Sequence, residues 1–362
     1  MQQKSIRRRE LLKTGAAAAA ATTLATPAIT ALAQPAAVTL KFHTFMAPQS
    51  NVWLNMHKAW MAKVEKESGG RIKFEAYPAM QLGGTPVQLY DQVKGSENLI
   101  LEHSAWKLRR KHGWPFPLPF EVFELPFMMS NAEATSKALW EYVQTMAADE
   151  FKDVHVLALH VHGPGVIHTV EKPVRSVNDV KGLKLRAPTR QATKLLASLG
   201  ATPVGMPLPG IPDALSKGTI QGAVIPWEVV PAVKVHELTK YHAEFDPAGG
   251  ALYTTTFVMS MNKAKYDALP ADLKKIIDNN TGMATSAFLG KVQQEGDIPG
   301  RKATVDRGNN IFTVSAAEAQ EFKNKSSLID DEWVADMNKR GYDGKKLLET
   351  AKALIAKHTK AK

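Results

Sequence analysis

The sequence predicts an α/β fold with parallel strands, divided into two lobes, on three observations. Residues 38–42 and 72–76 have the pattern of strands, and residues 52–64 between them carry an apolar stripe at helical spacing. This β-α-β order implies a parallel sheet. Farther along, residues 183–187 alternate like a strand and precede a helix that Thr189 can cap. The third observation is length, because a chain of 362 residues usually divides into two lobes.

The first 33 residues have the pattern of an export signal. Arg8-Arg9 resembles the pair of a twin-arginine signal, and a run rich in glycine and alanine follows at residues 15–21. The small residues at 31–33 suit signal peptidase, so the mature chain is expected to start near Gln34. The apolar run is too short and too rich in alanine for a membrane span. We expect a soluble periplasmic protein exported by the twin-arginine route; an uncleaved anchor is the alternative.

Composition restricts the chemistry. The chain has no cysteine, which excludes disulfides and thiolate metal sites. The net charge is +11, and removing the five basic residues and one acidic residue of the signal leaves 41 basic and 34 acidic side chains, or +7. This charge attracts anions but is too diffuse to indicate nucleic acid. We expect no nucleic-acid partner and no cofactor.

Arg186 stands at the carboxyl end of the strand at residues 183–187. The helix that follows it presents free N–H groups, which favour anions. In open α/β sheets this edge is where ligands bind. An arginine there offers a planar, two-pronged donor to a carboxylate. From the residues alone, a solvated charge at a strand end remains the alternative.

Five motifs follow one another along the chain: Phe123-Glu-Leu-Pro-Phe127, Lys181-Gly-Leu-Lys-Leu-Arg-Ala-Pro188, Leu199-Gly-Ala-Thr-Pro203, Ala214-Leu-Ser-Lys-Gly-Thr-Ile-Gln-Gly222, and Asn262-Lys263 with Leu269-Pro-Ala-Asp-Leu273. In this order they resemble the solute-binding proteins of tripartite ATP-independent periplasmic (TRAP) transporters, the DctP-like family. The resemblance extends from about Val38 to the C-terminus. It implies that Arg186 forms a salt bridge with the carboxylate of a small molecule, which the receptor delivers to the membrane subunits of a transporter.

The same resemblance implies a periplasmic-binding-protein-like fold, type II-like, with an interlobe cleft, hinge strands and a long connecting helix. We expect residues 34–160 and 251–298 to form lobe I. Residues 161–250 and 299–362 are expected to form lobe II and the C-terminal helices. Pro270 should open the long helix, which is expected to break near Pro299.

The candidate ligand-binding residues are Arg186, His168, Trp227, Phe45, Leu208 and Tyr253. Phe45 follows the first strand, where it can line the cleft, and a place in the core is an equal alternative. Tyr253 begins an apolar, threonine-rich run that is expected to cross back to lobe I.

Three of these positions differ from what the family commonly carries. His168 stands near a second arginine of many members, and Leu208 stands where relatives have an aromatic residue. Residues 225–227, Ile-Pro-Trp, replace a polar contact of relatives that bind sugar acids. The replacements predict an apolar, aromatic pocket and an aromatic or apolar monocarboxylate as ligand. A neutral histidine suits a singly charged ligand; a core role for Trp227 is the alternative.

Residues 95–120 depart from the family pattern. The family has a short strand and a small-residue loop there, whereas this chain has Trp106 and the basic residues Lys107, Arg109, Arg110 and Lys111. We favour a local disruption of the reading frame, because family-like sequence resumes at Glu121. A true insertion and a basic-aromatic patch for nucleic acid or membrane are the alternatives.

Three other functions compete. His155, His160, His162 and His168 suggest a metal site, but no carboxylate or cysteine stands at matching spacing. A hydrolase is disfavoured because the sequence lacks a nucleophile elbow, a Walker loop, a dinucleotide turn and a zincin motif. A sensor-type binding protein that docks to a signalling partner could use the same fold.

Overall fold

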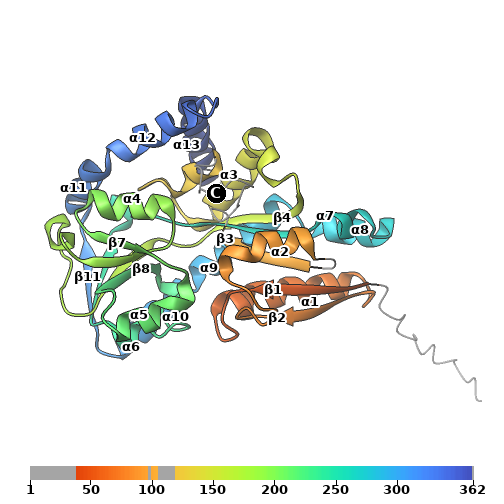
Figure 1. Ribbon diagram of the computed structural model, residues 1–362, viewed down its shortest axis with the longest axis horizontal. Helices are drawn as coiled ribbons and strands as arrows, with labels where there is room; N and C mark the ends of the chain where they lie inside the picture. The colour runs from red at the N-terminus through yellow and green to blue at the C-terminus, as the bar shows by residue number, and fades with distance from the viewer. Residues whose placement is uncertain (1–37, 97–98, 105–118, 361–362) are drawn as a thin grey trace, which may run out of the picture. The chain divides into compact units, whose positions relative to one another are not determined.

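The computed structural model describes residues 38–96, 99–104 and 119–360, which form two β-sheets with helices around them (Figure 1). The signal segment expected at residues 1–33 lies outside this range. None of the helices in the described part of the chain is long and apolar enough to cross a membrane.

The first sheet has five strands in the order β2-β1-β3-β10-β4. Strands β1, β2 and β3 run parallel, and β10 pairs antiparallel with both β3 and β4. Between β1 and β2 lie a π-helical turn and α1, and their inward residues Val52, Met56, Trp60 and Val64 are buried as predicted. The strands are β1 (Val38–Thr44), β2 (Ile72–Tyr77), β3 (Leu99–Ser104), β4 (Val154–Val161) and β10 (Thr256–Asn262), with α1 at Lys58–Glu67.

The second sheet has six strands in the order β11-β9-β5-β8-β6-β7. Strand β6 runs parallel to β7 and β8, whereas β5 is antiparallel to β8 and β9. The strands are β5 (Gly165–Thr169), β6 (Lys184–Ala187), β7 (Thr202–Gly205), β8 (Gly222–Pro226), β9 (Tyr241–Phe245) and β11 (Asn310–Val314).

Two of the chain segments that connect the sheets lie side by side. The chain leaves the first sheet after β4 and enters β5, and it returns from β9 to β10. At the crossing, Gly165 N donates to Tyr253 O at 3.0 Å, and Thr254 Oγ1 donates to His162 O at 2.8 Å. The two sheets and their crossing strands confirm the predicted two-lobed α/β fold.

The turn after β6 forms as the sequence predicts. Helix α4 (Arg190–Ser198) begins after Thr189, whose hydroxyl accepts a hydrogen bond from Ala192 N at 3.1 Å. This N-cap satisfies one of the free donors at the start of the helix. Arg186 therefore stands at the carboxyl end of β6, beside the first turn of α4.

The long helix expected after Pro270 is in fact three helices. They are α8 (Ala271–Asn279), α9 (Met283–Glu295) and α10 (Asp297–Asp306). Gly282, at φ 101°, separates the first two, in a backbone conformation that other residues rarely adopt. The break expected near Pro299 lies three residues earlier, at Gly296 between α9 and α10. Pro299 itself is in the first turn of α10, where its missing N–H costs no helical hydrogen bond.

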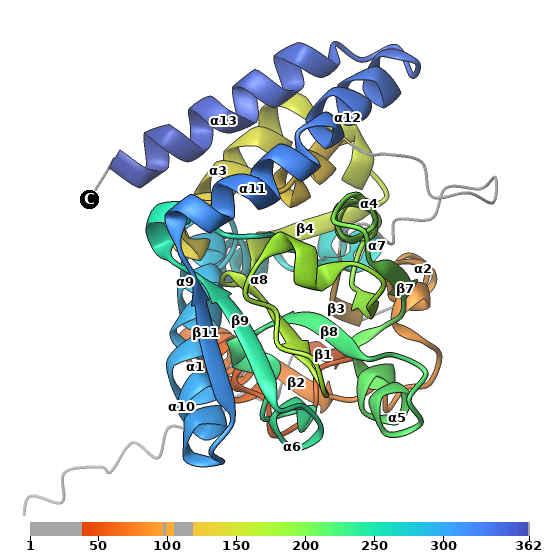
Figure 2. The ribbon, with the colours of Figure 1, turned by 90° about the vertical axis from the view of Figure 1, so that its left-hand side faces the viewer.

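Three helices close the chain: α11 (Ala316–Ser326), α12 (Leu328–Asn338) and α13 (Gly344–Lys360). Ser315 and Glu318 form the predicted capping box at the start of α11. Figures 1 and 2 show α13 alongside α3 (Ala132–Met146), and His358 Nε2 lies 2.7 Å from Glu141 Oε2 between them. The exact lobe boundaries stay a prediction.

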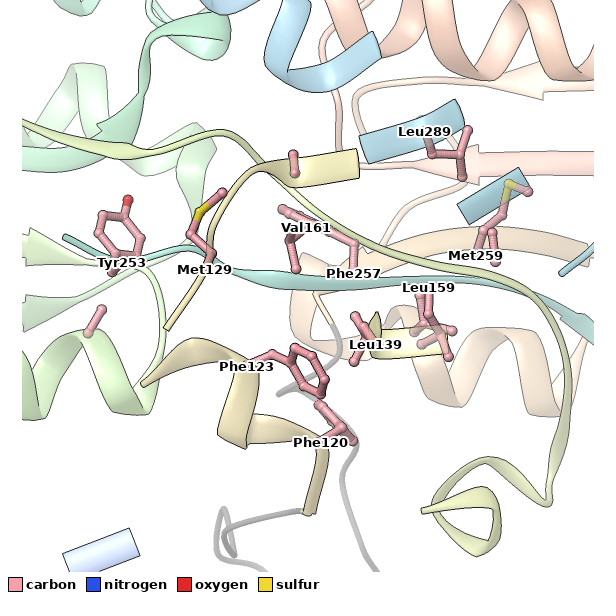
Figure 3. Packing of buried hydrophobic residues seen from close by; sticks show 14 of the residues in the cluster. Phe120, Phe123, Met129, Leu139, Leu159, Val161, Tyr253, Phe257, Met259 and Leu289 are labelled. Atoms are coloured by element: carbon pink, nitrogen blue, oxygen red, sulfur yellow. The ribbon is translucent and has the colours of Figure 1, made fainter. Parts of the chain in front are cut away.

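The core continues from the first sheet to the helices that cover it. Figure 3 shows Phe120, Phe123 and Leu139 packed beneath the strands that carry Leu159 and Phe257. Phe120 and Phe123 belong to a 3₁₀ segment, η4 (Pro119–Glu124). This segment places the motif Phe123–Phe127 under the crossing strands.

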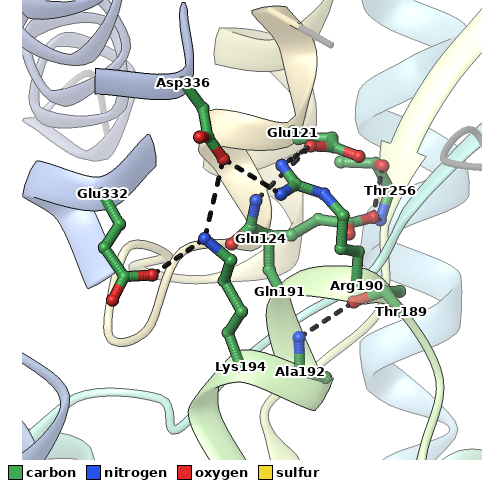
Figure 4. A network of polar contacts seen from close by, with 10 residues as sticks. All are labelled: Glu121, Glu124, Thr189, Arg190, Gln191, Ala192, Lys194, Thr256, Glu332 and Asp336. Carbon is green, nitrogen blue, oxygen red and sulfur yellow. Dashed lines mark hydrogen bonds and ion pairs between the residues drawn. The ribbon is translucent and has the colours of Figure 1, made fainter. Parts of the chain in front are cut away.

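Glu124 is a buried acid in this core, and its ionisation should destabilise the fold. Burial raises its pKa to about 7, although Thr256 N and Oγ1 donate to its Oε1 at 2.9 and 2.6 Å (Figure 4). Between pH 4.5 and 7 the folded protein keeps a proton that the unfolded chain has released, so stability falls as the pH rises through this window.

We expect the variant Glu124→Gln, which cannot ionise, to escape this loss. Its free energy of unfolding, measured by urea titration from pH 4.5 to pH 8, should rise relative to that of the wild type as the pH increases. Contributions from other titrating groups cancel in the difference between the two proteins. Parallel pH profiles would show that Glu124 ionises without cost to the fold.

Part of the unusual segment at residues 95–120 belongs to the first sheet. Strand β3 lies between β1 and β10 and pairs with both of them. Residues 97–98 and 105–118, which include Trp106 and the basic cluster, lie outside the described residues. The disruption of the reading frame therefore stays a prediction.

Candidate ligand-binding site

A small cavity lies where the two sheets and the crossing strands meet. The first lobe contributes the loop after β1, the second lobe contributes the ends of β6 and β8, and helix α9 closes one side. Its lining residues are Phe45, Met46, Pro86, His162, Arg186, Pro188, Pro207, Leu208, Ile225, Pro226, Glu228, Val229, Tyr253, Thr255, Phe257 and Gln293. Most of these side chains are apolar, which suits a small ligand with a largely apolar body.

A second hollow adjoins the cavity and is lined from both lobes. The two spaces share the side chains of Phe45, Met46, Pro86, Leu208 and Val229. The outer hollow adds only small, apolar or uncharged polar residues to this list. A ligand entering between the lobes would therefore pass apolar walls before it reaches the polar groups.

Among the described residues, Arg186 is the only arginine or lysine that lines this cavity, and it is 5% exposed. Its Nε donates to Met206 O at 3.0 Å and its Nη1 to Val224 O at 3.1 Å, which fixes the guanidinium. Burial lowers its pKa to about 10, so it remains a cation at neutral pH. No carboxylate of the described residues forms an ion pair with it. A buried charge of this kind is costly unless an anion accompanies it.

Two hydroxyl groups accompany this charge. Tyr253 Oη and Thr255 Oγ1 are buried and have no hydrogen-bond partner within the described ranges. Burial raises the pKa of Tyr253, while nearby Arg186 lowers it, and the phenol stays a protonated donor. Gly165 makes room for this ring, since a Cβ there would lie 1.9 Å from Tyr253 Cε1. Both hydroxyls can donate to an anion held by Arg186.

The structure brings together four of the six candidate residues: Arg186, Phe45, Leu208 and Tyr253 all line the cavity. His168 does not line it. Strand β5 lies between β8 and β9, and His168 is fully buried there, with Nδ1 2.7 Å from His242 Nδ1 and Nε2 3.1 Å from Ile225 O. Burial holds its pKa well below the ordinary value, so His168 is a neutral group behind the wall that Ile225 forms.

Trp227 also lies outside the lining of this cavity. It begins a 3₁₀ turn, η8 (Trp227–Val229), and its Nε1 donates to Glu244 Oε2 at 3.1 Å. Its ring meets the ring of His168 edge-on at 5.1 Å. The turn directs Trp227 to a separate hollow beside Asp297, while Ile225 and Pro226 form the apolar wall.

Four polar lining residues were missed: His162, Thr255, Glu228 and Gln293. His162 and Thr255 belong to the crossing strands. The sequence signalled His162 only as a candidate metal ligand, and Thr255 only as part of a threonine-rich run. Gln293 lies on α9 and Glu228 in η8, about 65 positions apart in the chain. No local pattern marks such a pair, because only tertiary packing brings them together.

The histidines do not form a metal centre. Within the described ranges no group of three histidine, aspartate or glutamate side chains could hold a metal ion. His160 stacks on Phe257 at 5.1 Å, and His162 meets Tyr253 edge-on at 5.4 Å. Burial lowers the pKa of His162 to about 3, so this cavity-lining histidine is neutral.

In the described part of the chain, two lobes enclose a cavity with one buried cation, an arrangement that suits a solute-binding protein. Residues 43–336 match the profile of the bacterial extracellular solute-binding protein family 7, DctP, and the chain belongs to this family. The match confirms the resemblance to TRAP solute receptors. The family is extracytoplasmic, which supports a periplasmic location.

Two solved structures are close to this chain. One is a TRAP solute-binding protein from Rhodoferax ferrireducens T118 with copurified benzoate, 66% identical, with a TM-score of 0.86 over 89% of this chain and 99% of the other. The second is a marine metagenome TRAP solute-binding protein specific for aromatic acid ligands, with 3-hydroxybenzoate, 47% identical, with a TM-score of 0.85 over the same shares. A curated relative, the outer membrane transporter protein TsaT of Comamonas testosteroni, is 26% identical over 88% of this chain and 92% of its own length.

Proposed function

We propose that this protein is the periplasmic receptor of a TRAP transporter and binds an aromatic monocarboxylate in the cavity at Arg186. One observation carries the proposal: a buried arginine without an anionic partner in the described structure stands in a cavity whose lining is mostly apolar. The ligand carboxylate would supply the missing charge. The twin-arginine segment supports export to the periplasm, where the receptor would pass its ligand to the membrane subunits.

Each lining group has a role in this proposal. Arg186 pairs with the carboxylate, and the hydroxyls of Tyr253 and Thr255 donate to its oxygens. Phe45 and Leu208 cover the apolar ring of the ligand from the two lobes, so closure of the lobes buries it. His168 and Trp227 support the wall from behind through Ile225.

The relatives support an aromatic ring over a sugar. The two solved relatives, at 66% and 47% identity, are in complex with benzoate and 3-hydroxybenzoate. Each of these ligands carries one carboxylate on one aromatic ring. Most of the described lining residues are apolar and few are polar, so the cavity would leave several hydroxyls of a sugar acid without partners. Such unpaired groups would weaken binding.

The experiment is a ligand series on the purified mature chain, read by thermal shift and calorimetry. We expect benzoate to raise the melting temperature, because a ligand that binds only the folded state stabilises it. Benzamide, which has the same ring but no charge, should have no measurable effect, and galactonate should bind far more weakly than benzoate. Preferential binding of galactonate would contradict the proposal.

A further inference from the structure

The polar group that this proposal leaves unused is the carboxamide of Gln293. Gln293 lines the same cavity from α9 and is 1% exposed. Its Nε2 donates to Glu228 Oε1 at 2.9 Å. Its Oε1 is buried and has no hydrogen-bond partner in the described part of the chain.

Glu228 fixes which end of the carboxamide is free. A carboxylate only accepts hydrogen bonds, so the amide nitrogen of Gln293 must face it and the amide oxygen must point elsewhere. Glu228 is itself held, because its backbone N donates to Asp297 Oδ1 at 2.9 Å. The cavity therefore contains a fixed acceptor, which a ligand can satisfy only with a donor.

This acceptor comes from a different element than the cation. Arg186 enters the cavity from β6, whereas Gln293 enters from α9, and apolar side chains such as Phe45 and Leu208 form the walls. An aromatic ring whose carboxylate is held at Arg186 can place a ring hydroxyl near Gln293 Oε1. A buried acceptor left without a donor is costly, so a site of this kind discriminates against the analogue that lacks the hydroxyl.

We propose that the cavity selects hydroxylated aromatic acids, whose ring hydroxyl donates a hydrogen bond to Gln293 Oε1. This inference rests on the proposed function, because it assumes that the carboxylate lies at Arg186. It assigns Gln293 the role of distinguishing a ring hydroxyl from a bare ring, and Glu228 the role of orienting the carboxamide.

The first test needs only the wild-type protein. Calorimetry would compare benzoate with 3-hydroxybenzoate, 4-hydroxybenzoate and the two matching methoxybenzoates. We expect at least one hydroxybenzoate to bind about tenfold more tightly than benzoate, the range of one buried hydrogen bond. The matching methoxybenzoate, which cannot donate, should bind more weakly than benzoate.

The second test changes the acceptor. In Gln293→Leu the ratio of the benzoate and hydroxybenzoate dissociation constants should fall from about ten to about one. In Glu228→Gln the carboxamide of Gln293 is free to turn and present its N–H to the cavity. The affinity for the methoxybenzoate should therefore rise relative to the affinity for the hydroxybenzoate. Gln294→Leu is the matched control, because Gln294 is the next residue on α9 but bonds Ala132 N outside the cavity; it should keep the wild-type ratio.

The outcomes separate the two proposals. If the wild type binds none of these acids, the proposed function fails. If it binds benzoate as tightly as both hydroxybenzoates, only the role of Gln293 is overturned. The wild-type series decides this even if Gln293→Leu does not fold. An unchanged ratio in folded Gln293→Leu would also overturn the inference.

Discussion

Replacing Arg186 by methionine is expected to weaken benzoate binding about 100- to 1000-fold, or by about 3–4 kcal/mol. Of the side chains that the structure describes in the cavity lining, the guanidinium is the only cationic one, and it is 5% exposed. Without it, the carboxylate would be buried against two hydroxyls that cannot balance its charge. Calorimetry with benzoate on both proteins measures the effect.

The same substitution should leave the stability of the ligand-free protein nearly unchanged. Methionine forfeits the hydrogen bonds to Met206 O and Val224 O but also removes a buried charge that no carboxylate in the described structure balances. Arg186→Lys is the informative comparison, because it keeps a positive charge but loses the two-pronged geometry. Its affinity for benzoate should fall between those of the wild type and Arg186→Met. A dissociation constant for Arg186→Met within tenfold of the wild type would place the carboxylate elsewhere.

The position of Arg186 could be predicted from the sequence because every signal for it is local. Alternation defines β6, a proline ends it, and Thr189 caps the next helix within a few residues. The role of the arginine came from the family resemblance rather than from the pattern. Local periodicity likewise predicted β1, β2 and the helical segment between them. These elements follow one another in the chain, so their contacts join residues that are close in sequence.

The neighbours of Arg186 depend on contacts that no local pattern encodes. His168 is buried because β5 pairs with β8 and β9, strands more than 50 and 70 positions later. The 3₁₀ turn after Pro226 directs Trp227 away from the cavity, to the hollow beside Asp297. Gln293 reaches the site only because α9 is separate from α8, a break that Gly282 introduces.

Arg190→Met should destabilise the protein by about 3 kcal/mol, because it removes the cationic partner of a buried carboxylate. Arg190 is the first residue of α4, and its Nη2 lies 2.6 Å from Glu121 Oε2 in η4, whose side chain is 2% exposed (Figure 4). Its Nη1 lies 3.4 Å from Asp336 Oδ2 on α12. One guanidinium thus ties the helix beside the cavity to two other parts of the fold.

Lys194, one turn later on α4, provides the matched control because its ion pairs are exposed. Its Nζ lies 2.8 Å from Glu332 Oε2 and 3.6 Å from Asp336 Oδ2, and the Glu332 side chain is 57% exposed. Solvent screens such pairs, so Lys194→Met should cost less than about 1 kcal/mol. Urea unfolding of the two variants, with equal m-values, measures the difference. Equal costs for the two would mean that the burial of Glu121 does not decide the strength of its ion pair, and that α4 is held mainly by its apolar face.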